Sequence, residues 1–232
     1  MDETRTDEPG LAEPQEERLD LSDTRRAEAF SDAVFAIVAT LLALDLKPPP
    51  GRPGQLLDEL LARWPTYVAF ISSFLYVGVV WLNHKAVFGH LRAMTRTTHW
   101  LNLGILSNVT LLPFPTAVIA SAVESGNDDD SQVAVALYGL VGALLCASWL
   151  VFFHHLSKHP DLLHDHMRGS FYGRERTRAA AGVVLYLLGA VAGIVSAPGA
   201  MALFLLLPVF YGVTSHGLTV LPGPLRWVLP RH

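Results

Sequence analysis

Six long apolar segments most strongly limit what this chain can fold into. They cover residues 27–46, 64–83, 100–123, 132–155, 179–196 and 199–218. A helix of about 20 residues rises about 30 Å, which matches the hydrocarbon core of a bilayer. Ala197-Pro198-Gly199 predicts a tight turn between the last two segments. The sequence therefore predicts an all-α polytopic membrane protein with six transmembrane helices.

Charged residues lie mostly outside these segments. Only 16% of the 232 residues are charged, and residues 1–22 combine many charges with few large apolar side chains. Such a segment buries too little apolar surface to fold. We expect a disordered cytosolic tail over 1–22, a six-helix transmembrane domain over 23–220 and a short cytosolic tail over 221–232. The net charge of −4 comes mainly from the first tail, so we do not expect a nucleic-acid partner.

The distribution of Lys and Arg predicts the orientation in the cell membrane. One side would hold three connections, namely 47–63, 124–131 and 197–198. Of the 17 Lys and Arg residues, these connections contain only Lys47, Arg52 and Arg63. The other side would hold both tails and the connections 84–99 and 156–178. Because Lys and Arg favour the cytoplasmic side, both termini are predicted to be cytoplasmic.

The first segment has three faces at the helical period of 3.6 residues. A small face holds Ala29, Asp32, Ala36, Ala39 and Ala43, a bulky face holds Phe30, Ile37, Leu41 and Leu44 with Thr40 beside it, and a third face holds Ser31, Phe35, Val38 and Leu42. Small residues let membrane helices approach closely, so the small face is predicted to pack against protein and to keep Asp32 out of lipid. Asp32 is either a structural pin or a group that takes part in ion or proton passage.

Partners for the Asp32 carboxylate are expected near the cytoplasmic side. Candidates are Ser31, Arg26 and the polar groups of residues 81–85, which end the second segment. The start of the first helix and the end of the second would lie on the same side of the membrane, so such contacts are possible.

The spacing Arg26-x-x-x-Phe30-Ser31-Asp32 resembles the RxxxFSD signature of the TMEM175 family of lysosomal and prokaryotic potassium channels. The layout resembles the prokaryotic members with one six-helix repeat per chain, over about residues 24–220.

The resemblance continues on the second helix. Trp81 and His84 are similar to the family's polar pair, and Asn83 is expected in the same cluster. The resemblance implies that this network ties helix ends together and does not touch the ion.

The resemblance also implies a homotetramer in the lipid bilayer, with the first helices around a central pore. Its hydrophobic constriction would take the place of a carbonyl filter and would fall on Ile37, Leu41 and Leu44, with Thr40 beside them. The expected function is a potassium-permeable cation channel with weak selectivity for potassium over sodium. Potassium would be the permeant ion, and no cofactor is expected.

Two acidic residues lie near the ends of the first segment. Asp45 at the outer end and Glu28 at the inner end could form rings of carboxylates at the pore mouths. The alternative is that each is a solvated residue at a helix end.

Other motifs give less specific predictions. Five histidines occur between residues 154 and 166, namely His154, His155, His159, His164 and His166. They could bind metal or sense pH, but their spacing lacks a convincing zinc ligand set, and we favour a solvated loop and no metal site. Pro113 and Pro115 predict a kink or break in the third segment. Gly189 and Gly193 form a GxxxG that predicts close helix contact.

Two further functions stay open. A proton-coupled secondary transporter would use Asp32 as its titrating group, and a non-transporting membrane scaffold would carry no ion flux. The sequence contains no HExxH, GxSxG or phosphate loop, so we do not expect an enzyme.

Overall fold

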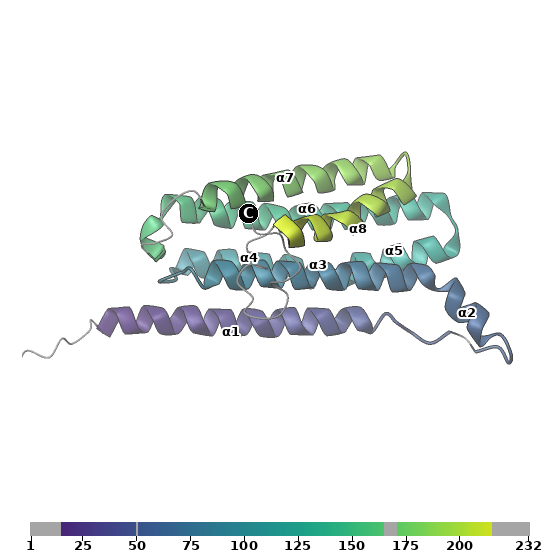
Figure 1. Cartoon of the computed structure of the whole chain (residues 1–232), viewed down its shortest axis with the longest axis horizontal. Coiled ribbons are helices and arrows are strands. Elements are labelled where there is room, and N and C mark those ends of the chain that lie inside the picture. The colour runs from purple at the N-terminus through teal and green to yellow at the C-terminus, as the bar shows by residue number, and fades with distance from the viewer. Residues whose placement is uncertain (1–14, 50, 165–170, 215–232) are drawn as a thin grey trace, which may run out of the picture.

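The computed structural model describes residues 15–49, 51–164 and 171–214 (Figure 1). The helices follow one another as α1 Gln15–Ala43, α2 Leu56–Ala62, α3 Trp64–Phe88, α4 Arg96–Thr110, α5 Pro113–Ser125, α6 Asp128–Lys158, the 3-10 turn η1 Pro160–Leu162, α7 Phe171–Gly193 and α8 Ala197–Thr214. The predicted all-α class is confirmed.

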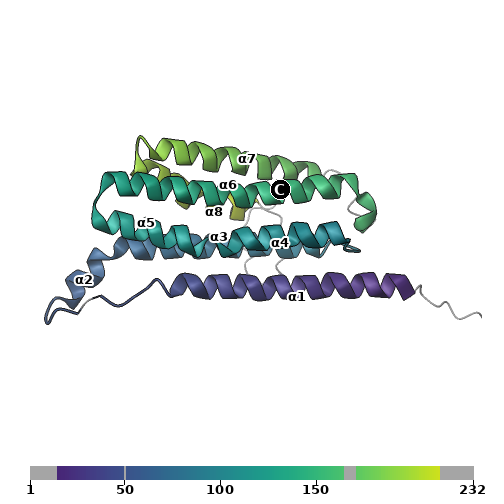
Figure 2. The same ribbon diagram turned by 180° about the vertical axis from the view of Figure 1, so that it is seen from behind.

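The long helices run roughly along one direction in three layers (Figures 1 and 2). α1 forms one outer layer, α3 lies beside α4 and α5 in the middle, and α6, α7 and α8 form the third. One end of the bundle holds α2 and the turns between α5 and α6 and between α7 and α8. We call it the α2 end. The opposite end holds the start of α1, the α3–α4 connection and η1, and we call it the η1 end.

Three helical segments are long and apolar enough to cross a membrane. They are Trp64–Phe88, Arg96–Ser125 and Asp128–Lys158. α8 adds a shorter apolar stretch, Ala197–Val209. α1 is less apolar because it carries charged residues, among them Arg26 and Glu28 in its first half and Asp32 just past its middle. Among the described residues, length and composition thus mark three of the six predicted segments as clear candidate spans.

The predicted break in the third apolar segment is confirmed. α4 ends at Thr110 and α5 begins at Pro113, with Pro115 two residues further on. Proline has no N–H to donate to a preceding turn, but it fits the first turn of a helix, where that N–H is not needed. The segment therefore continues as a second helix along the same path.

Two predicted boundaries differ in the structure. α1 begins at Gln15, inside the tail predicted for residues 1–22, because residues 15–19 are good helix formers. Residues 1–14 and 221–232 lie outside the described part. The acidic connection 124–131 is also shorter than predicted, since its three aspartates form the first turn of α6. The Asn127 side chain caps that helix by accepting the Asp130 N–H at 3.0 Å, and the aspartates favour the positive helix end.

The predicted close contact at the GxxxG of α7 is confirmed. A Cβ on Gly193 would lie 2.5 Å from Cγ1 of Val135 in α6. A Cβ on Gly189 would overlap the ring of Phe204 in α8. Both glycines therefore let α7 approach its neighbours more closely than alanine would.

The backbone joins two connections at the η1 end. Leu91 and Leu163 form an isolated bridge, the Arg92 N–H donates to the Leu162 carbonyl at 2.9 Å, and the His164 N–H donates to the His90 carbonyl at 3.3 Å. Leu91, Leu162 and Leu163 are buried. The α3–α4 connection is therefore held against η1.

The histidine-rich segment is partly helical. His154 and His155 belong to the last turns of α6, and the rings of His155 and His159 have centroids 4.3 Å apart. Among residues 15–49, 51–164 and 171–214, no group of three or more His, Cys, Asp or Glu side chains is placed to hold a metal ion. His166 lies outside the described residues.

Candidate functional site

α1 packs on its own bundle through the third of its predicted faces. Ser31, Phe35, Val38 and Leu42 are all buried, against α3 and α4. The prediction that the small face makes this contact is wrong within one chain, because Ala29, Ala36 and Ala43 are exposed and Asp32 and Ala39 are half-buried. Larger side chains fill the space here, and the Phe35 ring meets the His84 ring edge-on at 5.3 Å.

The predicted constriction residues lie on the uncovered face of α1. Ile37 is 57% exposed, Leu41 41% and Leu44 69%. Thr40 is also exposed, and its hydroxyl donates to the Ile37 carbonyl at 2.7 Å. That bond keeps the hydroxyl on its own helix, so the face is almost wholly apolar. Nothing in the described chain encloses it.

The two acidic residues flank this face. Glu28 and Asp45 are both half-buried, on either side of the apolar stretch. Glu28 lies near the middle of α1, on the η1 side of the apolar stretch, and Asp45 lies two residues beyond the last residue of α1, on the α2 side. The arrangement is therefore an apolar strip with one carboxylate toward each end.

A buried polar chain links α1 to α3 and α4. The Asn102 amide of α4 donates to Ser31 Oγ at 3.0 Å and pairs through Oδ1 with His84 Nε2 at 2.9 Å. Ser31 Oγ in turn donates to the Ala27 carbonyl at 2.8 Å. Because Oδ1 only accepts, His84 must carry its proton on Nε2. All hydrogen bonds then point one way, from His84 to Asn102 to Ser31 to the α1 backbone.

A second bond joins α1 to α3 one residue further on. The Trp81 indole Nε1–H donates to Asp32 Oδ1 at 2.8 Å. The Lys85 ammonium lies 5.6 Å from the centre of the same indole ring, within the range of a cation–π contact. Among the described residues, the hydrogen-bond partner of the Asp32 side chain is therefore a neutral donor, and the Lys85 ammonium lies over the ring of that donor.

An open groove of about 390 Å³ runs along the α1–α3 contact. Its lining residues are Asp32, Phe35, Ala36, Ala39, Phe74, Val77, Gly78 and Trp81. Ala36 and Ala39 of the predicted small face form one wall, so this part of the face borders the groove, while Asp32 of the same face bonds to Trp81 of α3.

The structure brings some predicted network residues together and separates others. Arg26 and Phe30 are exposed on α1. Asn83 is not part of the network. It lines a separate cavity of about 60 Å³ that also contains Arg178. Asn102 takes the place expected for Asn83. Sequence reasoning missed Asn102 because a lone amide in an apolar segment does not indicate which helix it faces. Its position inside an apolar segment was nevertheless a signal, since a polar side chain in a membrane helix needs hydrogen-bond partners.

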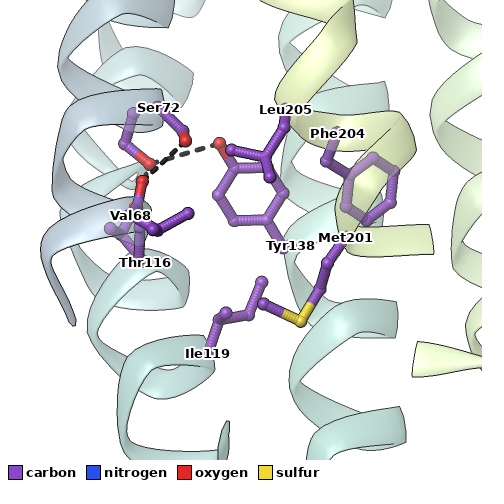
Figure 3. A pocket seen from close by; sticks show the side chains of 10 residues that line it. Val68, Ser72, Thr116, Ile119, Tyr138, Met201, Phe204 and Leu205 are labelled. Carbon is purple, nitrogen blue, oxygen red and sulfur yellow. Dashed lines mark hydrogen bonds between the residues drawn. The ribbon is translucent and has the colours of Figure 1, made fainter. Parts of the chain in front are cut away.

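A second buried polar cluster joins α3, α5 and α6 closer to the α2 end. Ser73 Oγ lies 2.8 Å from Thr116 Oγ1 and 3.3 Å from the Tyr138 hydroxyl. Figure 3 shows Thr116 and Tyr138 among the side chains that line a cavity of about 30 Å³. Apart from Ser72, its other lining residues are apolar. The cluster satisfies its own hydroxyls and lies away from α1, so it serves as an internal join between helices.

Comparisons with known proteins give consistent matches. Residues 26–113 match the family model described as "Endosomal/lysosomal potassium channel TMEM175". The chain is 37% identical over 207 residues to "Potassium channel B446_29190" of Streptomyces collinus, which covers 89% of this chain and 97% of that protein. It is 39% identical over 145 residues to "Potassium channel Cha6605_3372" of Chamaesiphon minutus, with coverage of 60% and 66%.

A solved structure has the same fold. The crystal structure of a lysosomal potassium-selective channel TMEM175 homolog from Chamaesiphon minutus superposes with a TM-score of 0.74. It is 27% identical and covers 84% of this chain and 99% of that one.

Proposed function

Because this chain belongs to the TMEM175 family of potassium channels, we propose that it is a potassium-permeable cation channel of the cell membrane. The proposal draws on two relatives described as potassium channels, which match 89% and 60% of this chain. It also draws on an all-helical membrane fold in which α1 leaves an almost wholly apolar face uncovered by the described part of its own chain. The family is one of ion channels, in keeping with a sequence that carries no catalytic motif.

Four copies would place their α1 helices around one central pore. The observation that carries this step is the division of α1 into two faces. One face holds a buried polar chain that ends at Ser31, and the opposite face leaves Ile37, Leu41 and Leu44 without cover from the same chain. A pore on the second face would enclose these side chains while the first face holds α1 to its bundle.

The bundle would cross the membrane six times, with α4 and α5 forming one broken span. Both termini would then be cytoplasmic, with the η1 end inside and the α2 end outside. The few basic residues near the α2 end, Lys47, Arg52 and Arg63, support this orientation.

The constriction would filter ions by hydration. A ring of Ile37, Leu41 and Leu44 offers no oxygen ligand to a cation, and Thr40 directs its hydroxyl to a carbonyl of its own helix. Ions would pass only when water fills the neck, because apolar constrictions block conduction by dewetting. Such a neck discriminates little between potassium and sodium, so we expect weak selectivity. Glu28 and Asp45 would then favour cations at the two mouths.

Asp32 would act as a pin and not as a carrier of ions. Its carboxylate accepts the Trp81 N–H, a donor that cannot titrate, and it lies off the bulky face. A proton-coupled transporter is the second candidate, favoured by the position of Asp32 beside the α1–α3 groove. A transporter predicts that Asp32→Asn abolishes flux in purified, correctly assembled protein.

The experiment is a potassium-flux assay in liposomes with matched variants. Ile37→Asn should raise the flux, by about tenfold for every 1.4 kcal/mol that hydration removes from the barrier. The control is Ile71→Asn, because Ile71 of α3 has a similar exposure of 54% but lies off the proposed pore face. Equal effects of the two variants would refute the constriction. A wild type without any flux would favour a scaffold.

The tetramer needs its own measurement. Chemical cross-linking of the purified protein should give a ladder that ends at four subunits. A ladder that stops at two would refute the central pore.

A further inference from the structure

The short helix α2 exposes all its large apolar side chains. It stands off the end of the bundle, beyond the start of α3 (Figures 1 and 2), and none of its residues is buried. Leu57 is 68% exposed and Leu61 64%, and Trp64, which begins α3, is 57% exposed. A soluble surface rarely presents such a group of leucines and a tryptophan together without a partner.

These side chains form one face of a helix. At about 100° per residue, the four leucines of α2 fall within one arc of roughly 140°, and the exposed Trp64 follows at the start of α3. The opposite arc of α2 holds Asp58 and Glu59. Segregation this complete over so few residues indicates that the apolar face meets an apolar medium while the other face meets water or protein.

The polar face is held by the preceding loop. Glu59 accepts the Gly51 N–H at 3.0 Å and the Arg52 N–H at 3.3 Å, and it pairs with the Arg52 guanidinium at 3.9 Å. Arg63 donates to the Lys47 carbonyl. These bonds fix the rotation of α2 about its axis. The leucines therefore point away from the loop.

The position of α2 identifies what the leucines meet. Arg63 alone separates α2 from α3, which is a candidate span that begins at Trp64. α2 must therefore lie at the boundary of the bilayer. There an amphipathic helix places its apolar face among the upper acyl chains, and tryptophan is enriched at the same depth.

We propose that α2 is an interfacial anchor, with Leu57 and Leu61 inserted into the lipid leaflet at the α2 end of the bundle. The occupant of this face is lipid. The anchor would fix the depth of α3 and, through the Arg63 and Glu59 bonds, the path of the chain from the end of α1. The proposal depends on the membrane-spanning fold alone and not on which ion passes.

The test measures lipid contact at single positions. Cys146 is buried, so the full-length chain with Cys146→Ser is the background for Leu57→Cys, Leu61→Cys and the control Asp58→Cys. Each is labelled with the environment-sensitive dye NBD and reconstituted in phosphatidylcholine vesicles. Matching elution from size-exclusion chromatography checks assembly. Quenching is measured with lipids that carry a nitroxide near the headgroup and separately with aqueous iodide.

The proposal expects opposite behaviour on the two faces. Labels at 57 and 61 should be quenched at least twofold more by the nitroxide lipid than the label at 58, and at least twofold less by iodide. Equal quenching at 57 and 58 would overturn the proposal. Protection of 57 and 61 from both quenchers would also overturn it, because it would mean that a second copy of the chain covers this face.

Discussion

Asn102 is the residue whose removal should weaken the α1 attachment most. It joins His84 of α3 to Ser31 of α1 through two hydrogen bonds, and it is itself buried. His84 is completely buried, and its Nδ1 has no hydrogen-bond partner. The Asn102 bond is therefore the one hydrogen bond that satisfies the His84 ring. The informative variant is Asn102→Ala.

The cost follows from the groups left behind. A buried donor without a partner costs about 1–3 kcal/mol, and the lost bond to Ser31 contributes about 1 kcal/mol. Asn102→Ala should therefore lower the free energy of unfolding by about 2–4 kcal/mol. A chain of this size loses about 2–4 °C of melting temperature for each kcal/mol, which gives a fall of about 4–16 °C. Intrinsic fluorescence of the purified protein on heating measures it.

Two comparisons separate the network from a generic packing effect. Asn108→Ala makes the same change on the same helix, but Ser148, its partner, keeps bonds to two backbone carbonyls, so the loss should stay near 1 kcal/mol. His84→Phe should be tolerated better than Asn102→Ala, since His84 already stacks on Phe88 with ring centroids 3.9 Å apart. In that background Asn102→Ala should cost at least 1 kcal/mol less. Equal losses for Asn102→Ala and Asn108→Ala would refute the reasoning.

Three further predictions follow from other contacts. Gly142→Ala should lower the melting temperature by several degrees, because the new Cβ would lie 2.5 Å from the fully buried ring of Tyr186 and overpacking costs about 1–3 kcal/mol. An unchanged melting curve would contradict this prediction. Trp81→Phe removes the donor to Asp32, a bond to a charged group worth about 1.5–3 kcal/mol, and the loss should disappear when Asp32→Ala is already present, because no acceptor then remains. Asp45→Asn should reduce cation conductance more at 10 mM than at 1 M salt, since the screening length falls from about 30 Å to about 3 Å; equal reductions would indicate that Asp45 is remote from the mouth.

The sequence predicted well which residues lie at the same level along neighbouring helices. It predicted less well which side of a helix each residue faces. Trp81 and Asp32 were expected at facing helix ends, and the structure joins them. Asn83 is only two residues from Trp81, but two steps of about 100° turn it to another side of α3, where it lines a different cavity. Helix crossing angles, which no local pattern encodes, bring Asn102 into the network instead.

The same limit explains the faces of α1. Sorting by period separated the three stripes correctly, but residue size did not reveal which stripe meets the bundle. The choice depends on the shapes of α3 and α4, where Phe35 fits beside His84. The bulky stripe of Ile37, Leu41 and Leu44 was separated by its period, and its proposed role stays a prediction because a single chain does not enclose a pore.

Two variants that affect opposite faces of α1, one in α1 itself and one in α4, provide the strongest joint test of how α1 works. If one face carries ions and the other holds the helix, Ile37→Asn should change flux and leave the melting temperature within about 1–2 °C, since exposed substitutions cost under about 0.5 kcal/mol. Asn102→Ala should do the reverse, lowering the melting temperature while the ratio of potassium to sodium flux in surviving channels stays unchanged. Both variants are measured in the same preparation, with Ile71→Asn and Asn108→Ala as controls. A changed selectivity in Asn102→Ala would mean that the polar chain sets the position of the pore face, and the two faces would then act as one unit.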